Sequence, residues 1–178
     1  EVYLDTESEE IFRLAEGRRH KCLKRDIKLA SNKTNGNELL INETKNIDAE
    51  IYVQALPTAP FLSRQSIDEA VFSLLVSEKN DSLFAVIRDN LYLWRKEGIP
   101  SNYDPSNIPN SIDLNETIIE TMGLYLIKKE ALSKTKSRIG ESPILFNIPT
   151  IESIDIDTDE DFKFAEIVLA GVKLLKHG

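Results

Sequence analysis

Two kinds of hydrophobic pattern alternate along the first half of the chain. Short apolar runs at residues 2–4, 51–53 and 82–87 have the length and composition of buried β-strands. Between them, at residues 11–15 and 67–75, apolar positions recur three and four residues apart, which is the spacing of one helix face. Strands that alternate with helices are typical of helices packed on a mainly parallel sheet. The pattern therefore predicts an α/β fold with a mainly parallel sheet flanked by helices.

Polar residues mark where several of these elements begin. Thr6 opens a capping box ahead of the first helix, because its hydroxyl and a carboxylate three residues later can both bond exposed backbone amides. Ser63 has the side chain of an N-cap for the helix that follows it. Residues 32–37 have turn chemistry, and we expect a helix after them at about 38–45. A weaker strand candidate lies at 20–24.

The second half of the chain is interrupted by a long polar segment. Within residues 88–118, the stretch 98–115 is rich in Pro, Asn, Ser and Asp, which predicts either an inserted functional arm or a disordered segment. Apolar strands resume at 122–127 and 144–148, and a helix at about 159–176 closes the chain. That helix has an apolar stripe made of Phe162, Ala165, Leu169 and Val172. We expect one domain over residues 1–178, with the arm inserted at 88–118.

Composition and charge limit the classes of partner. Hydrophobic residues make up 41% of the 178 residues and charged ones 29%, which is an ordinary globular balance. The 22 Lys and Arg against 30 Asp and Glu give a net charge of −8, so the sequence predicts no nucleic-acid partner. The single cysteine, Cys22, excludes an internal disulfide. No apolar run approaches the roughly 20 residues of a membrane span, and we expect a cytoplasmic protein without a membrane partner.

A pair of acids near the C-terminal helix carries the clearest candidate chemistry. If residues 154–157 are extended, side chains alternate and Asp155 and Asp157 share the face opposite the core. Two carboxylates this close repel each other unless a cation lies between them, and oxygen ligands of this kind suit Mg²⁺ with a bound phosphate. Two other interpretations stay open. Thr158 with the acids after it forms a good helix start, and acids outside a strand are often simply solvated.

Two further features are suggestive. Residues 57–60 (Pro-Thr-Ala-Pro) follow a buried strand, and loops at the carboxyl ends of parallel strands are where α/β sheets bind ligands. Arg25 follows the candidate strand at 20–24, where a guanidinium can bind a phosphate or sugar oxygen. Taken alone, a stiff turn and a surface arginine are the simpler interpretations of these two features.

Taken together and in this order, the segments resemble the acylneuraminate (CMP-sialic acid) cytidylyltransferases. The Ser-Ile-Asp-Ile-Asp-Thr motif is the most specific part of the resemblance, which spans essentially the whole chain. The matching segments are residues 4–11, 25–31, 57–60, 123–126 and 153–162.

The resemblance implies a fold, a reaction and site residues. The fold is the Rossmann-like α/β fold of nucleotide-diphospho-sugar transferases, in a homodimer. The reaction joins a nine-carbon 2-keto sugar acid to the α-phosphate of CTP and releases pyrophosphate. Asp155 and Asp157 are the implied catalytic residues and Mg²⁺ ligands, and the arm serves the sugar and the dimer contact. The implied nucleotide-binding residues are Arg25, Thr34, Asn35, Gly36, Pro57 and Thr58. The implied substrate-binding residues are Gln54, Thr121, Gly123 and Tyr125.

Departures from the family pattern leave alternatives open. Leu56 and Leu62 stand where the family has Gln and Arg, and Met122 is the only methionine in a chain that opens at Glu1. The glycine- and lysine-rich loop that opens the family's fold would precede Glu1, so we expect a domain that lacks this loop and is a poor catalyst by itself. The alternatives are a non-catalytic nucleotide- or sugar-binding module, and a transferase for another sugar acid.

Overall fold

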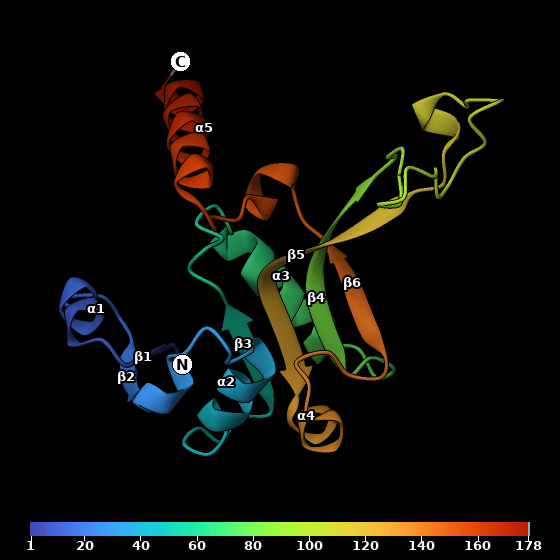
Figure 1. Cartoon of the computed structure of the whole chain (residues 1–178). Helices are drawn as coiled ribbons and strands as arrows, with labels where there is room; N and C mark the ends of the chain where they lie inside the picture. The colour runs from blue at the N-terminus through green and yellow to red at the C-terminus, as the bar shows by residue number, and fades with distance from the viewer. Residues whose placement is uncertain (178) are drawn as a thin grey trace.

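The computed structural model describes residues 1–177 and contains two β-sheets with helices around them (Figure 1). The strands are β1 (Tyr3–Thr6), β2 (Lys21–Lys24), β3 (Ile51–Ala55), β4 (Ser82–Asp89), β5 (Thr117–Lys128) and β6 (Pro143–Asn147). The helices are α1 (Glu9–Leu14), α2 (Gly36–Glu43), α3 (Arg64–Leu75), α4 (Lys129–Thr135) and α5 (Asp159–His177). Short 3-10 turns lie at Ile27–Leu29, Ser111–Asp113 and Thr150–Ser153.

The larger sheet has the strand order β3-β5-β4-β6. β4 and β6 are parallel, and β5 runs antiparallel to both β3 and β4. β3, β4 and β6 therefore share one direction, as the sequence predicted, and β5 is inserted against them. β1 and β2 form a separate parallel pair. The α/β prediction is confirmed, with one antiparallel strand that it did not include.

The core lies on both faces of the larger sheet. On one face, Ala70 and Leu74 of α3 pack against Leu83 of β4 and against Leu124 and Leu126 of β5. On the other face, α2 and α4 pack against Tyr52 of β3 and Ile127 of β5, because successive side chains of a strand point to opposite faces. That second cluster contains Leu40, Tyr52, Ile127, Ala131 and Leu132. The sheet is thus the middle layer of three.

The helices begin at the polar capping residues that the sequence predicted, except that the N-cap of α1 lies two residues later. Ser63 caps α3, and its Oγ accepts a hydrogen bond of 3.0 Å from the backbone N–H of Ser66. For α1 the N-cap is Ser8 rather than Thr6, with its Oγ 3.4 Å from the N–H of Ile11. Thr6 instead accepts a bond from the N–H of Ser8 through its Oγ1. The sequence pattern did not predict α4.

Two parts of the chain extend away from the body (Figure 1). The first is the arm between β4 and β5, whose strands stay paired as far as Asp89 and Thr117. Beyond that pair, the ring of Tyr103 contacts those of Tyr92 and Trp94 edge to face, at 5.2 and 6.1 Å between centroids. The arm is therefore folded on its own aromatic residues.

The second extended part is α5. Of the predicted stripe on this helix, Ala165 is buried, whereas Phe162 and Leu169 are exposed. Only part of the stripe packs on the body. No helix in the described part of the chain combines the length and the apolar character needed to cross a bilayer.

Candidate active site

The site begins where β3 pairs with β5. Gln54 lies directly opposite Tyr125 in the ladder, and both side chains are buried. The guanidinium of Arg138 stacks on the Tyr125 ring, with 3.6 Å between Cζ and the ring centroid. Arg138 also donates from Nη1 to Gln54 Oε1 at 3.4 Å, and Gln54 Nε2 donates to the carbonyl of Gly36 at 3.3 Å. One arginine therefore joins a predicted nucleotide-binding turn to two predicted substrate-binding residues.

The turn at residues 34–36 is shaped by the start of α2. Asn35 and Glu38 form a capping box in which each side chain accepts from the backbone N–H of the other. Thr34 Oγ1 lies 3.2 Å from the Ser31 hydroxyl. A Cβ on Gly36 would lie only 2.5 Å from Arg138 Nη1, so glycine is required for the arginine to approach the turn.

A second group of predicted residues meets at the carboxyl end of β3. The backbone N–H of Ile156 donates to the Thr58 carbonyl at 2.9 Å, which holds the Asp155–Asp157 segment against the Pro57–Thr58 loop. On the other side of this loop, a Cβ on Gly123 would lie 2.7 Å from the Cβ of Ala59. Gly123 thus permits close packing of the loop on β5, a structural role beside the predicted substrate contact.

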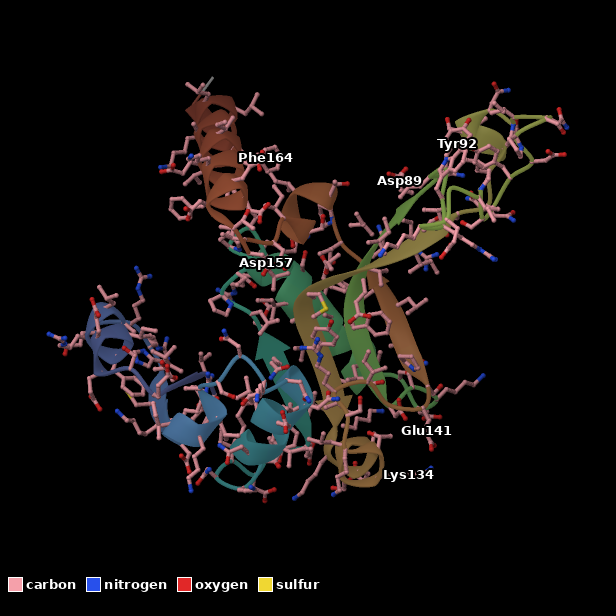
Figure 2. All side chains as sticks on the ribbon, in the orientation of Figure 1. Asp89, Tyr92, Lys134, Glu141, Asp157 and Phe164 are labelled. Atoms are coloured by element: carbon pink, nitrogen blue, oxygen red, sulfur yellow. The ribbon has the colours of Figure 1, made fainter. Side chains whose placement is uncertain are left out.

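The two candidate catalytic acids lie in irregular backbone rather than in the extended strand that the sequence predicted. A single backbone bond, from Ile156 to Thr58, pairs this segment with the loop after β3, so no ladder forms. Asp155 is half-buried and lines an open, shallow hollow of about 500 Å³ between the Thr150–Ser153 turn and α5. Its Oδ1 is buried without a hydrogen-bond partner. Asp157 is exposed where the chain enters α5, as Figure 2 shows.

Asp161, which follows the pair, has the role at the start of a helix that the sequence predicted for these acids. The carboxylate of Asp161 accepts from the backbone N–H and the hydroxyl of Thr158, at 2.9 and 2.7 Å, and from the N–H of Asp157 at 3.2 Å. These bonds lower the pKa of Asp161. They explain the acids at the start of α5, but they leave the carboxylate of Asp155 without a partner.

Asp155 and Asp157 are suitable oxygen donors for Mg²⁺. The described residues contain no cluster of three or more His, Cys, Asp or Glu side chains that could enclose a metal. Mg²⁺ needs no such cluster, because it is commonly held by one or two carboxylates together with substrate phosphates and water. The orphaned Asp155 Oδ1 beside this hollow is consistent with that arrangement. At such a site Mg²⁺ would be shared between protein carboxylates and substrate phosphates.

The hydroxyl of Tyr125 has its own partners beside the stacked arginine. It donates to Glu120 and lies 3.0 Å from the sulfur of Met122. Burial, the bond to Glu120 and the charge of Asp155 raise the pKa of Tyr125, although Arg138 opposes the shift. Tyr125 is therefore a neutral hydrogen-bond donor at any physiological pH.

The bulge in β5 shapes this region. The ladder pairs Phe84 with Tyr125 and Val86 with Glu120, so residues 121–124 of β5 lie opposite Ala85 alone. Met122 takes a left-handed conformation there, with φ of 60°. Bulges of this kind redirect side chains and are frequent beside active sites.

The hydroxyl of Thr121, a predicted substrate-binding residue, lies within the bulge. It is buried and donates to the Ala85 carbonyl at 3.1 Å, so this donor already has a partner inside the protein.

Arg25 lies apart from the Arg138 group. It donates to Asp5 through Nε and to the Asp5 carbonyl through Nη2, at 3.1 and 2.9 Å, and lies 3.8 Å from Glu7. The predicted phosphate-binding arginine is therefore engaged in a network that supports β1 and β2. Glu43 lies beside this network, close enough to Asp5, Arg25 and Gln54 for these side chains to act on its carboxyl group. Burial and the charge of Asp5 raise the pKa of Glu43 to about 7.

Arg138 is the site residue that sequence reasoning missed. It lies in the loop between α4 and β6, where no periodic pattern guided a prediction. Its partner Gln54 is 84 positions away in the chain. A lone arginine in a polar loop carries no local signal of such a contact.

Comparison with known proteins identifies the family of this chain. Residues 1–132 match the family model described as cytidylyltransferase. The chain belongs to the cytidylyltransferase family. It is thus a nucleotidyltransferase, as predicted, and CTP is the nucleotide that the family name implies. The match does not single out the sialic acid branch that the motifs resemble. A search of curated proteins found no match to the sequence.

Two solved structures have a similar fold. One is 4-diphosphocytidyl-2C-methyl-D-erythritol synthase from Anaerococcus prevotii DSM 20548, with a TM-score of 0.62 and 14% identity, over 92% of this chain and 77% of that one. The other is CMP:2-keto-3-deoxy-manno-octonic acid synthetase complexed with CTP, with a TM-score of 0.62 and 12% identity, over 96% of this chain and 81% of that one. At these identities the likeness confirms the α/β fold.

Proposed function

We propose that this cytidylyltransferase joins CTP to a sialic-type, nine-carbon 2-keto sugar acid and forms the CMP-sugar and pyrophosphate. The observation that carries the proposal is the Asp155–Asp157 segment held against Thr58, with one carboxylate oxygen buried and unpartnered. The Ser-Ile-Asp-Ile-Asp-Thr motif around it supports the sialic acid branch. The fold supports the location, because ligands of α/β sheets bind at the carboxyl ends of the parallel strands.

In this proposal the anomeric hydroxyl of the sugar attacks the α-phosphorus of CTP. A bond forms between that oxygen and phosphorus, the bond to the pyrophosphate oxygen breaks, and the hydroxyl proton is released. Asp155 and Asp157 would hold Mg²⁺, which would neutralise phosphate charge when bound. Thr34, Asn35 and Gly36 face the nucleotide together with the Pro57–Thr58 loop.

On the sugar side, the proposal places Gln54, Thr121, Gly123 and Tyr125. Tyr125 suits this place because its hydroxyl stays protonated: its one O–H is donated to Glu120, and its oxygen can accept a hydrogen bond from a sugar hydroxyl. The resemblance places Arg25 on the nucleotide side, and in the fold its guanidinium bonds Asp5.

Replacing Asp157 with asparagine tests the metal assignment. Asp157 is exposed, so Asp157→Asn is expected to leave the fold intact, whereas a neutral amide is a poor Mg²⁺ ligand. With CTP, Mg²⁺ and a nine-carbon sugar acid, we expect pyrophosphate release by the full-length gene product to fall about 100-fold or more. Asp159→Asn, an exposed acid two positions later, is the matched control and should keep the parent rate. An undiminished rate in Asp157→Asn would exclude the metal role.

A specific observation favours a second candidate, a binding module without catalysis. Leu62 stands where the resemblance places an arginine, and its side chain packs on the α3 face of the core. The module would bind CTP without releasing pyrophosphate from any sugar acid. A panel of nine-carbon, eight-carbon and other sugar acids, with pyrophosphate release as the readout, separates the module from a transferase with a different substrate.

We also propose that the protein is a cytoplasmic homodimer and that the arm at 88–118 carries the dimer contact. Several large apolar side chains of the arm face solvent, among them Ile112, which is 84% exposed, and Trp94, which is 57% exposed. The aromatic cluster around Tyr103 gives these side chains a fixed support. Exposed apolar surface on an ordered extension suits a protein partner, and a second copy of the chain would also bring its arm towards the sugar side.

A further inference from the structure

Arg138 is a charged group without a charged partner. Its guanidinium is half-buried, and its contacts are the Tyr125 ring, the amide of Gln54 and, at 3.6 Å, the sulfur of Met122. All of these partners are neutral. Among residues 1–177, no carboxylate oxygen lies within ion-pair distance of Arg138. Glu120 and Asp155 both act on the hydroxyl of Tyr125, yet neither pairs with the arginine.

The surroundings of Arg138 hold it in place. Its backbone N–H donates to the side chain of Asn37 at 2.9 Å, which ties the loop to α2. The loop turns through Lys136, which has a φ of 55°, and Ile139 donates to the Ser137 hydroxyl at 3.1 Å. The missing side chain at Gly36 leaves the space that Nη1 occupies. These contacts position a cation in advance of any ligand, which lowers the entropic cost of binding.

A guanidinium in this setting is suited to an oxyanion. It carries several N–H donors in a planar fork that matches a carboxylate or a phosphate with two parallel hydrogen bonds. The long contact of 3.4 Å to Gln54 leaves most of this capacity unused. Stacking on Tyr125 fixes the plane of the fork while its edge stays available.

We propose that Arg138 binds an anionic group of the substrates, either the carboxylate of the sugar acid or a phosphate of CTP. The inference rests on the proposed function and names a binding residue for it. Both sources share the same oxyanion chemistry, and Arg138 lies between them, with Gly36 on the nucleotide side and Tyr125 on the sugar side. The two sources are distinguished by which binding constant depends on Arg138.

The experiment compares Arg138→Gln and Arg138→Lys with the parent full-length protein. Dissociation constants for CTP and for the sugar acid are measured separately by calorimetry, and KM and kcat by pyrophosphate release. We expect Arg138→Gln to weaken one of the two ligands by about 10- to 100-fold. Arg138→Lys should recover part of that loss, because an ammonium keeps the charge but not the fork. Arg64→Gln is the control, since the side chain of Arg64 is 93% exposed on α3, and it should change neither constant.

A sugar acid with its carboxylate converted to an amide identifies the source. If Arg138 binds the carboxylate, the parent protein discriminates against the amide and Arg138→Gln does not. If it binds a phosphate, the loss is confined to CTP and both proteins treat the amide alike. Unchanged constants for both ligands in a folded Arg138→Gln would overturn the proposal. Should that variant not fold, Arg138→Lys replaces it, and unchanged affinities in Arg138→Lys would equally overturn the proposal.

The outcome is separable from that of the proposed function. If the parent protein binds CTP but releases no pyrophosphate with any sugar acid, the proposed reaction fails. Weaker binding of CTP or of the sugar acid by Arg138→Gln would still support Arg138 as an anion-binding residue, and unchanged binding of both ligands would overturn it.

Discussion

Changing Glu43 to glutamine perturbs the polar network that joins β1 to α2 and β3. The Glu43 side chain lies beside Asp5 and Gln54, and Arg25 lies close enough for its charge to act on it. Asp5 Oδ1 is buried and has no hydrogen-bond donor. We expect a protonated Glu43 to supply that donor, and the side-chain amide introduced by Glu43→Gln to supply one at every pH.

The direction of the pH effect follows from the raised pKa. Burial first, and then the charge of Asp5, raise the pKa of Glu43 from 4.5 to about 7, so the folded protein binds more protons than the unfolded chain between these values. The contribution to stability is therefore fully present below pH 4.5 and is lost as the pH rises through about 7. A shift of this size corresponds to at most about 3 kcal/mol. Because Glu43 is only half-buried, we expect about 1–2 kcal/mol.

The assay is urea unfolding followed by far-UV circular dichroism at about pH 5 and about pH 8.5. The free energy of unfolding of the parent protein should fall by about 1–2 kcal/mol over this interval. Glu43→Gln should lose this slope and be the more stable protein at the higher pH. Glu10→Gln, a change at an exposed position of α1, should keep the parent slope. If Glu43→Gln keeps the parent's fall in unfolding free energy with pH, or is less stable than the parent at about pH 8.5, Glu43 is not the source of the effect.

Two other features give direct predictions. Gly123→Ala places a Cβ 2.7 Å from that of Ala59, so we expect a loss of about 1–3 kcal/mol in urea unfolding; unchanged stability would show that the Pro57–Thr58 loop yields freely. Ile112→Asp puts a charge at the most exposed apolar position of the arm, and sedimentation equilibrium should then give a monomer where the parent gives a dimer. A parent protein that is itself monomeric at micromolar concentration would contradict the proposed dimer.

The elements that the sequence predicted well are those fixed by local signals. α3 combines an N-cap at Ser63 with apolar positions at Ala70 and Leu74, and each of these can be seen within one short window. The direction of β5 has no such signal. A chain that leaves β4 through an arm can return on the same side of the sheet and run antiparallel, or cross over and run parallel. Only the packed structure decides between these paths.

The site was predictable to the extent that its residues belong to contiguous motifs. Residues 57–60 and 154–157 were singled out separately, and the structure joins them through the Ile156–Thr58 hydrogen bond. Arg25 illustrates the limit, since its partners Asp5 and Glu7 come from the neighbouring strand and the turn after it. An arginine that looks available in the sequence can be engaged in the fold, and Arg138, which carried no signal in the sequence, is available.

The place of β5 between β3 and β4 has a consequence for synthesis of the protein on the ribosome. β3 and β4 share no hydrogen bonds with each other, because each forms its ladder with β5. A nascent chain that has emerged only as far as the arm therefore carries two apolar strands with unpaired edges. The sheet can close only after Lys128 has left the exit tunnel. Until then the growing polypeptide depends on chaperones or on rapid translation to avoid aggregation.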